Sequence, residues 1–551
     1  MKRSLTRSSN RSIRGRRPLA ECVPDGRSGD SRPGIDGKRG SRVAALAEGF
    51  AAQTKHLHGL TKTWTKALRA TAWLVGSGVA QELDSRKGQK LFTRVIESLA
   101  GAQGPIVRAA MEGVFEPELG ELALLPTTKR DSARCLVARI AAIVRIAEAL
   151  HAGRCRDSRI VAVCEEGGGL AVEICGGSDV RRNADGVLRA AGLWNRLVSR
   201  PVVAVRVVKE AQKRVAADHG EAVAEAGRRI LLRQLEQLLC RQYGLAYADD
   251  VEFVHEMRVA TRRFRAAARI FRKAFEGRLE VPAQQLRELA DVLGEARDAD
   301  VFLGFLRDYR RRQATAQDAP LAQLIRVQER RRAAAYRRLL RICLAEEHQK
   351  RLTTLRRQFA AALGSPQGLQ ITSRGRTRTA AQRAQKALRR TMKTVLDFGP
   401  HWRSLSSEEQ HRLRIACKKL RYTAEFFAQQ FPPRLQELLK PVVRLQDLLG
   451  NAHDAEVYGQ RLAAYFKELG VSKSCGSKRK QKKSAKPAKA SARSAKARAC
   501  KADLRAWAAL RGHLRRRRQG DLRQAGAVWQ EFRTARVQQE FLALVKAPQG
   551  L

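Results

Sequence analysis

Two segments of this chain carry the same pattern of histidine, arginine and lysine residues. The first is HEMRVATRRFR, from His255 to Arg265, and the second is HRLRIACKKLR, from His411 to Arg421. At the same distance after each histidine comes an LG motif followed by acids, LGEARDADVF in the first case and LGNAHDAEVY in the second. Because the blocks keep their order and spacing, they predict one structural unit that occurs twice.

Each basic segment has the spacing of a helix on which a cationic row lies beside an apolar row, since residues three and four apart share one helix face. The apolar rows, which we expect in the core, are Met257, Ala260, Phe264, Ala268, Phe271 and Phe275, and Leu413, Ala416, Leu420, Ala424, Phe427 and Phe431. The candidate ligand residues are the cationic rows and a neighbouring matched pair: His255, Arg258, Arg262, Arg265, Arg269 and Arg272, then His411, Arg414, Lys418 and Arg421, with Arg263 and Lys419.

Cationic rows of this kind predict a polyanionic partner. Like charges one turn apart on a helix repel each other, and an anion lying along the row would offset that cost. Arginine presents a fork of donors to phosphate oxygens, and lysine presents a compact charge. Weaker basic faces indicate a groove rather than a single strip, and they consist of Arg326, Arg330, Arg337 and Arg341, and of Lys386, Arg390 and Lys393.

Two alternatives stay open for the charged residues of the repeats. The cations could face water or pair internally with acids of the LG motifs. Those acids, spaced i and i+2, could instead be metal ligands, but no histidine or third carboxylate converges on them in the sequence. We expect them to neutralise basic residues and to set the helix packing, and they are Asp298, Asp300, Asp454 and Glu456.

The two histidines occupy equivalent repeat positions at the head of the basic rows. HEMRV is not a zinc signature of the HExxH type, because no second histidine follows four residues later. If His255 and His411 touch phosphate, binding should strengthen as the pH falls through about 6.5, the usual pKa of histidine.

The composition allows hydrophobic cores but carries an extreme positive charge. Of 551 residues 44% are apolar, and 108 lysines and arginines against 54 acids give a net charge of +54. The length suffices for two or three domains. Self-repulsion at this charge favours a polyanionic partner, for which nucleic acid, acidic lipid, polyphosphate and sulfated sugar all qualify.

Neither the cysteines nor the N-terminus indicates export. The ten cysteines are scattered, without a CxxC pair or histidines at zinc-ligand spacing, so we expect reduced, buried thiols in a cytosolic protein. The N-terminus lacks the apolar region of a secretory signal, and no apolar run approaches the length of a membrane span. Its composition resembles an organellar transit peptide, but we expect a disordered basic tail, and no membrane partner.

The pattern along the chain predicts a mainly α-helical protein with three parts. Residues 1–42 are expected to be a disordered basic tail. Residues 43–212 read as a helical domain closed by a small sheet, with strands at 159–164, 170–175 and 201–208. Residues 218–545 read as helical, interrupted at 472–501 by a lysine-rich insertion that we expect to be flexible.

The four repeated blocks resemble the signature blocks of the CHAD family, the conserved histidine α-helical domain. The resemblance covers about residues 218–545 and implies two pseudo-symmetric four-helix bundles. It also implies non-enzymatic binding of inorganic polyphosphate, often at cytoplasmic polyphosphate granules. The implied ligands are His255, Arg258, Arg262 and Arg265, with His411, Arg414, Lys418 and Arg421. The lysine-rich insertion departs from the family pattern.

Residues 43–212 bear a fainter resemblance to the C-terminal, HD-like domain of the exopolyphosphatase and guanosine pentaphosphatase family. Where such domains carry LHDIG with its metal-binding His-Asp pair, this chain reads LVGSG, from Leu74 to Gly78. Val75 and Gly76 cannot bind a metal, so the domain is expected to be degenerate. His56 and His58 are the remaining histidine candidates, and we expect structural roles for both.

The leading hypothesis is therefore a polyphosphate-binding protein that is not an enzyme and uses no catalytic residue, cofactor or metal. One alternative is a nucleic-acid-binding protein, against which stands an aromatic content of 5% without aromatics interleaved along the basic rows. The basic tails are still expected to touch nucleic acid weakly. The other alternative is a phosphohydrolase acting through residues 43–212. The sequence does not indicate the oligomeric state.

Overall fold

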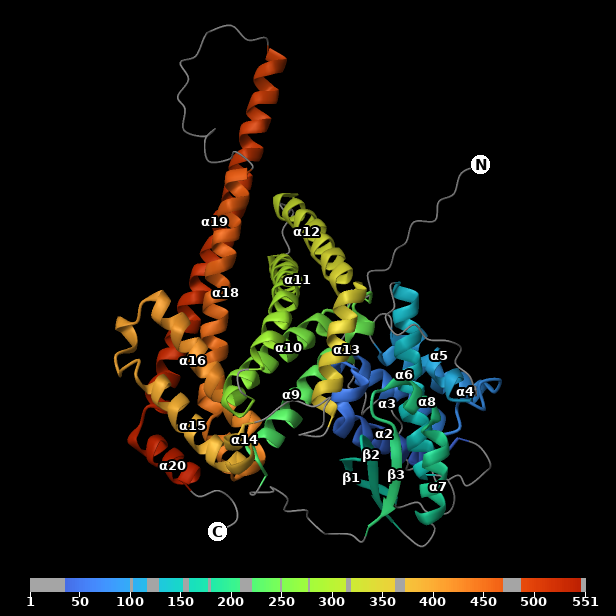
Figure 1. Ribbon diagram of the computed structural model, residues 1–551. Helices are drawn as coiled ribbons and strands as arrows, with labels where there is room; N and C mark the ends of the chain where they lie inside the picture. The colour runs from blue at the N-terminus through green and yellow to red at the C-terminus, as the bar shows by residue number, and fades with distance from the viewer. Residues whose placement is uncertain are drawn as a thin grey trace, which may run out of the picture. The chain divides into compact units, whose positions relative to one another are not determined.

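The computed structural model describes residues 35–99, 103–115, 128–151, 158–176, 180–208, 221–247, 250–275, 278–313, 319–361, 372–468 and 487–546. These residues form two compact units. One consists of Met1–Lys213 and Glu236–Met257, and the other of Arg214–Leu235 and Arg258–Leu551. Figure 1 labels the elements of both units. None of the described helices is both long and apolar enough to span a bilayer.

The first helix of the first unit starts earlier than the sequence predicts. Helix α2 spans Gly37–His58, because Asp36 accepts hydrogen bonds from the backbone N–H groups of Lys38 and Arg39 and so caps the helix. The helix ends at Gly59, whose φ of 68° is a left-handed conformation that suits glycine. The predicted basic tail therefore lies outside the described residues up to residue 34, and helical order begins at 37 rather than 43.

A layer of helices and a small sheet make up the first unit. The helices are α3 (Lys62–Gly76), α4 (Arg86–Ser98), α5 (Gln103–Phe115), α6 (Lys129–His151), α7 (Val180–Ala190) and α8 (Gly192–Leu197). The core centres on α2, α3 and α6, and it includes an edge-to-face pair between Phe50 and Trp194 whose ring centroids are 4.9 Å apart. Val75, in the segment that replaces LHDIG, is buried in this core.

The sheet has the three strands that the sequence predicts. Strand β1 spans Arg159–Glu166, β2 spans Gly169–Cys175 and β3 spans Val202–Val207. β1 and β2 form an antiparallel hairpin around a turn at Gly167 and Gly168, both with positive φ, and β3 pairs parallel to β2. β2 is buried along its whole length, which fits its central place in the sheet.

The second unit contains the repeated segments as long helices. Helices α9 (Val223–Leu239) and α10 (Glu252–Phe271) each contribute residues to both units. The others are α11 (Glu280–Gln313), α12 (Ala319–Leu344), α13 (Glu346–Ala360), α14 (Ser373–Thr377), α15 (Ala380–Leu396), α16 (Ser407–Phe426), α17 (Pro433–Leu438), α18 (Lys440–Glu468), α19 (Pro487–Phe532) and α20 (Ala535–Lys546). The two HxxR segments lie in α10 and α16, and the two LG motifs lie in α11 and α18.

Both apolar rows are buried, as the spacing predicts. Every residue of the two rows is at most 4% exposed, from Met257 to Phe275 and from Leu413 to Phe431. Phe271 of one row and Phe427 of the other approach to 5.6 Å between ring centroids. The core faces of the two repeats therefore meet.

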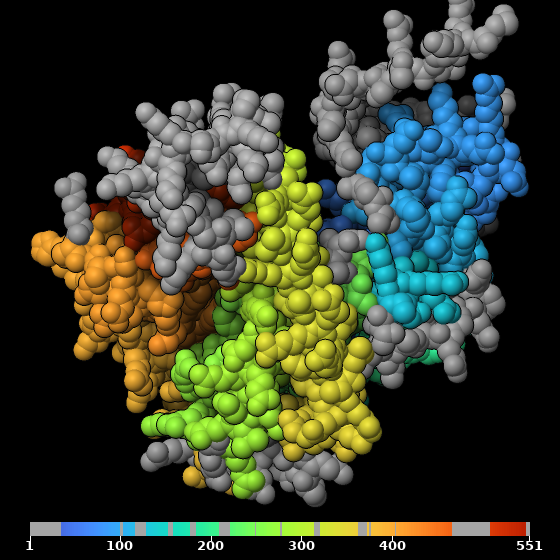
Figure 2. Space-filling view, turned by 90° about the horizontal axis from the view of Figure 1, so that it is seen from above, coloured from blue at the N-terminus to red at the C-terminus, as the bar shows by residue number. Residues whose placement is uncertain are grey.

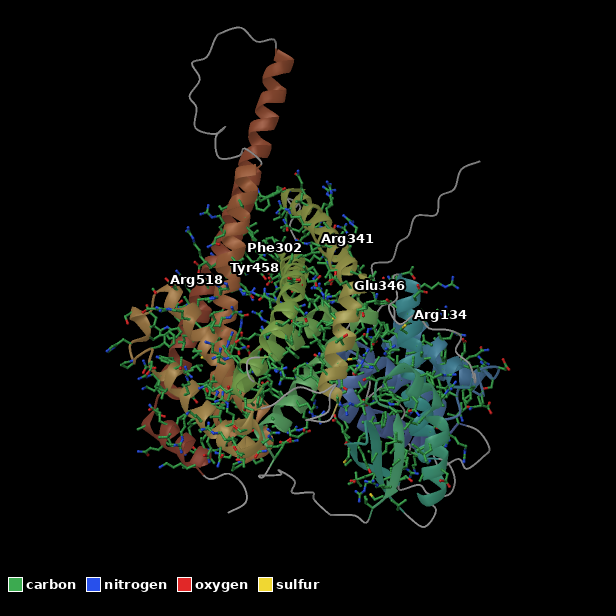
Figure 3. The ribbon with its side chains drawn as sticks, in the orientation of Figure 1. Arg134, Phe302, Arg341, Glu346, Tyr458 and Arg518 are labelled. Atoms are coloured by element: carbon green, nitrogen blue, oxygen red, sulfur yellow. The ribbon has the colours of Figure 1, made fainter. Side chains whose placement is uncertain are left out.

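A second contact between the repeats lies farther along the long helices. α11 packs on α12, visible side by side in Figure 2, and α18 packs on α19. Phe302 of α11 and Tyr458 of α18, both labelled in Figure 3, have ring centroids 4.8 Å apart. They belong to one apolar cluster with Leu324 of α12 and Trp507 of α19.

The C-terminal helices differ from the prediction at the lysine-rich segment. Residues 469–486 lie outside the described part of the chain, but α19 begins at Pro487, inside the predicted flexible insertion of 472–501. Alanine, lysine and arginine are strong helix formers, so residues 487–501 extend the helix. α19 packs on α18, and α20 follows it in the chain.

Candidate anion-binding site

From Arg258 onward the cationic row of α10 lies in the second unit, where it faces the row of α16. The guanidinium of Arg262, on α10, lies 5.5 Å from the ring centroid of Tyr422 on α16. Arg263 forms an ion pair of 2.8 Å with Glu425 of α16. Since the apolar rows of the same helices also meet, the rows of α10 and α16 line adjoining surfaces.

The pKa of Lys418 shows that the cations of the two rows lie close together. Burial, reinforced by the charges of Arg414, Arg262 and Arg258, lowers the pKa of Lys418 from 10.5 to about 7, and Asp454 only partly opposes this shift. Burial and the nearby Arg262 and Arg258 also lower the pKa of Arg414. We call Arg258, Arg262, Arg414 and Lys418 the central basic cluster, in which each repeat supplies two cations.

The glycines of the LG motifs make room for two members of this cluster. A Cβ atom at Gly450 would lie 3.5 Å from Nε of Arg414, and one at Gly294 would lie 3.8 Å from Nε of Arg258. Each guanidinium therefore lies against the backbone of the neighbouring long helix, and a bulkier side chain would push it away. The same contact occurs in both repeats, and it explains why the HxxR and LG motifs have the same spacing in each.

The acids of the first LG motif are engaged with arginines. Asp298 lies 3.8 Å from Arg258 and 3.6 Å from Arg461. Asp300 is buried, and its two oxygens accept hydrogen bonds of 2.6 Å from Arg332 and 2.9 Å from Tyr336, which joins α11 to α12. Burial nevertheless raises the pKa of Asp300 above its usual value.

The two acids of the second LG motif make contacts equivalent to those of the first. Asp454 faces the central basic cluster, and burial raises its pKa although Arg414 opposes the shift. Glu456 lies 3.4 Å from Arg518 of α19, as Asp300 pairs with α12. These contacts agree with the expectation that the acids neutralise basic residues and set the helix packing.

Several nitrogens of the site have no hydrogen-bond partner. Nε of Arg262, Nε of Arg414 and Nδ1 of His411 are buried and unpaired. Leaving a buried polar group unsatisfied costs about 1–3 kcal/mol.

The histidines are placed less symmetrically than the arginines. His411 begins the α16 row and packs on His453 of α18, with ring centroids 4.9 Å apart. Burial and the charge of Arg414 lower the pKa of His453, a residue that the sequence analysis did not single out. His255 is half-buried on α10, one turn before Arg258.

The remaining predicted ligands lie outside the central basic cluster. Arg263 and Arg421 share Glu425, at 2.8 Å and 2.7 Å, so internal ion pairs neutralise both. Lys419, Arg330 and Arg337 are exposed, the last two on α12. A surface pocket farther along α10 contains Arg265 and Arg269, together with Arg272 and Arg287. Burial and Arg287 lower the pKa of Arg265.

Tyr422 and the arginine run of α19 are the contributors that sequence reasoning missed. Tyr422 lies beneath Arg262, and the charge of Arg517 acts on Asp454. The run from Arg515 to Arg518 could have drawn attention to α19, because it follows the second LG motif in the chain as α12 follows the first.

A pair of facing, duplicated helices with a shared cationic site defines a repeat protein of the helical-bundle class. The model of the CHAD domain family matches residues 229–463 of this chain. The match does not reach residues 43–212, whose resemblance to the exopolyphosphatase family stays a prediction.

Similar proteins were found among curated sequences and solved structures. The uncharacterized proteins Rv2226 and MT2285, from two strains of Mycobacterium tuberculosis, are each 32% identical over 255 residues, which cover 43% of this chain and 45% of the relative. The chain thus spans about half the length of these relatives. The CHAD domain of the plant Ricinus communis is 21% identical, with a TM-score of 0.40 over 62% of this chain and 99% of that one. PptA from Streptomyces chartreusis is 14% identical, with a TM-score of 0.39 over 57% and 99%.

Proposed function

We propose that the protein binds inorganic polyphosphate, without chemically changing it, through the central basic cluster. The observation that carries this proposal is the convergence of Arg258, Arg262, Arg414 and Lys418 from two separate helices on a region where Asp454 is half-buried and outnumbered. Such an arrangement costs free energy in the absence of an anion, since like charges repel and buried charges lose hydration. A chain of phosphates would offset both costs.

The aromatic residues near the cluster favour polyphosphate over nucleic acid. Tyr422 is 6% exposed, and Arg262 and Arg263 lie over its ring. A ring covered in this way cannot stack on a base, whereas single-stranded nucleic acid is usually bound by stacking on aromatic side chains. The proposed ligand therefore needs phosphate groups but no bases.

Competition binding tests this selectivity. Long-chain polyphosphate, heparin and single-stranded DNA would compete for the full chain at several salt concentrations. We expect polyphosphate to displace the other two at a lower concentration of charge. Equal displacement by all three at matched charge would reduce the proposal to general polyanion binding.

Charge reversal tests the location of the site. Arg258→Glu with Arg414→Glu removes one cation from each helix, and loss of two charge-assisted contacts should weaken binding about 100-fold or more. Lys273→Glu with Arg412→Glu is the matched control: it makes the same change in charge directly after α10 and on α16, at exposed side chains that belong to neither cationic row. Similar losses in both pairs would show that net charge, not the central basic cluster, determines affinity.

The proposal includes the absence of catalysis and a place in the cell. Incubation with polyphosphate and Mg²⁺ or Mn²⁺ should release no phosphate, and metal-dependent turnover would support the phosphohydrolase alternative. A fluorescent fusion should concentrate at polyphosphate granules, and the Arg258→Glu, Arg414→Glu variant should disperse from them. A variant that stays at granules would point to another recruiting surface.

A further inference from the structure

Three potential metal ligands gather in the first unit, far in sequence from one another. They are His56 on α2, Glu165 on β1 and Glu236 near the end of α9. One ligand atom of each residue lies within 4.8 Å of the other two. Nothing in the polyphosphate site uses these residues.

Two of these side chains are buried with unused lone pairs. His56 is 6% exposed and Glu236 is 4% exposed. Neither ring nitrogen of His56 makes a hydrogen bond, and Oε2 of Glu236 makes none either. Buried polar groups are normally satisfied, so a set of this kind, aimed at one point, calls for a ligand.

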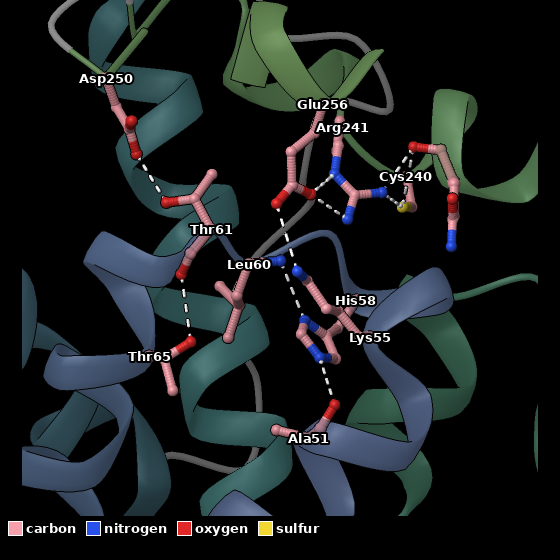
Figure 4. Close-up of polar contacts among 11 residues, drawn as sticks. Ala51, Lys55, His58, Leu60, Thr61, Thr65, Cys240, Arg241, Asp250 and Glu256 are labelled. Carbon is pink, nitrogen blue, oxygen red and sulfur yellow. Dashed lines mark hydrogen bonds and ion pairs between the residues drawn. The ribbon is translucent and has the colours of Figure 1, made fainter. Parts of the chain in front are cut away.

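His58, two residues along the same helix, shows what a structural histidine looks like here. Its Nε2 donates to the carbonyl of Ala51 at 2.9 Å, and its Nδ1 accepts from the N–H of Leu60 at 2.9 Å (Figure 4). Burial lowers the pKa of His58 to about 3, so the ring stays neutral, as two such bonds require. The expectation of a structural role therefore fits His58, and it leaves the nitrogens of His56 unexplained.

Arg200 orients both carboxylates. Its Nη1 lies 2.9 Å from Oε2 of Glu165, and its Nε lies 2.8 Å from Oε1 of Glu236. The other oxygen of Glu165, Oε1, lies 3.5 Å from Nε2 of the His56 imidazole, and Oε2 of Glu236 makes no hydrogen bond. A cation that holds ligating carboxylates by their outer oxygens is a common second layer around metal sites.

The charge balance also favours a bound cation. Two carboxylates face the single guanidinium of Arg200, and one of them, Glu236, is only 4% exposed. A divalent ion would balance the second carboxylate.

We propose that His56, Glu165 and Glu236 bind a divalent transition-metal ion, with Zn²⁺ as the best match. One imidazole nitrogen and two carboxylate oxygens are zinc ligands, and water can complete a tetrahedral shell. The side chain of Glu165 is 38% exposed, so the ion can enter from the side of β1. The bound ion would join α2, β1 and α9 and so stabilise the first unit.

Zinc binding to the full chain, after removal of metal with a chelator, tests the site. Equilibrium dialysis with Zn²⁺ gives the number of bound ions, and thermal unfolding gives the effect on the melting temperature. We expect His56→Gln and Glu165→Gln each to hold one zinc ion fewer than the wild-type chain, with at least about 100-fold weaker binding at this site. Both variants should also lose the rise in melting temperature that Zn²⁺ produces.

His151→Gln is the matched control. His151 is 7% exposed in the same unit, and both of its ring nitrogens also lack partners, but it belongs to no such group among the described residues. This variant should bind as much zinc as the wild-type chain. A wild-type chain with no more zinc than His56→Gln would overturn the proposal, as would an equal loss in His151→Gln. If His56→Gln fails to fold, Glu165→Gln decides the question, because Glu165 is partly exposed.

Discussion

Polyphosphate affinity should fall as the pH rises above 7, and Lys418 should be the cause. In the free protein the pKa of Lys418 is lowered from 10.5 to about 7 by burial and three neighbouring arginines, so half of the molecules lack this charge near neutral pH. Phosphate groups beside the ammonium favour its charged form and raise its pKa. Binding above pH 7 must therefore take up a proton, and affinity declines as protons become scarce.

The size of the fall in affinity depends on how far bound polyphosphate raises the pKa of Lys418. If the pKa of Lys418 rises from about 7 to between about 8.5 and 10.5 on binding, affinity should fall about 10-fold to 50-fold between pH 7 and pH 9.

Isothermal titration of the full chain with long-chain polyphosphate, at constant ionic strength, gives both the affinity and the protons taken up. Buffers of different ionisation enthalpy should show uptake at pH 8. Lys418→Arg keeps the charge at every pH of the experiment, so its affinity should change little from pH 7 to pH 9. A variant that keeps the full wild-type slope would refute the assignment to Lys418.

The same lowered pKa acts on stability without ligand. Between about pH 7 and pH 10.5 the unfolded chain holds a proton on Lys418 that the folded chain has lost, so the free energy of unfolding should rise with pH across this window. Below pH 7 both states carry the charge and the folded state bears its full cost. Lys418→Met should abolish this rise in urea denaturation measured across the window.

Substitutions at three further positions test the packing around the site. Gly450→Ala should keep polyphosphate affinity within about threefold of the wild-type value, because the new Cβ atom would lie at an ordinary contact distance of 3.5 Å from Arg414. Gly450→Leu should displace the Arg414 guanidinium and weaken binding about tenfold or more in a binding titration. Asp300→Asn should lower the free energy of unfolding by about 1–3 kcal/mol in urea, since Arg332 loses its buried partner, without changing affinity in the folded protein. Phe302→Ala should cost about 3–5 kcal/mol by thermal or urea unfolding, because it opens the apolar cluster between the repeats; a loss below 1 kcal/mol would contradict that role.

Helical periodicity was sufficient to predict the buried rows, because it depends only on local geometry. A residue such as Phe264 or Leu420 lies on the apolar face whatever the helix packs against, and both are buried. The strands of the small sheet were predictable for the same reason. Helix α19 shows the limit: a lysine-rich, alanine-rich segment reads as flexible by its lack of apolar residues, yet its residues have high helix propensity.

The fate of individual cations depends on tertiary contacts that spacing alone does not contain. Arg421 could have been excluded from the candidate ligands on the sequence alone, because Glu425 follows at i+4 and can pair with it. Arg263 could not, since the same Glu425 reaches it only when α10 and α16 pack together. The lowered pKa of Lys418 likewise arises from arginines of both repeats, so it exists only in the assembled fold.

The properties of the cations therefore depend on the packing of α10 against α16, and neither helix alone would produce them. Each helix alone presents a row of cations to water, where the charges would be screened and weakly selective. Facing each other, the rows leave both guanidinium groups half-buried, with Arg414 against Gly450 and its equivalent Arg258 beside Asp298. The two halves of the site are therefore equivalent in sequence and unequal in environment, because Asp298 pairs with Arg258 in the first repeat, whereas burial lowers the pKa of both Arg414 and Lys418 in the second.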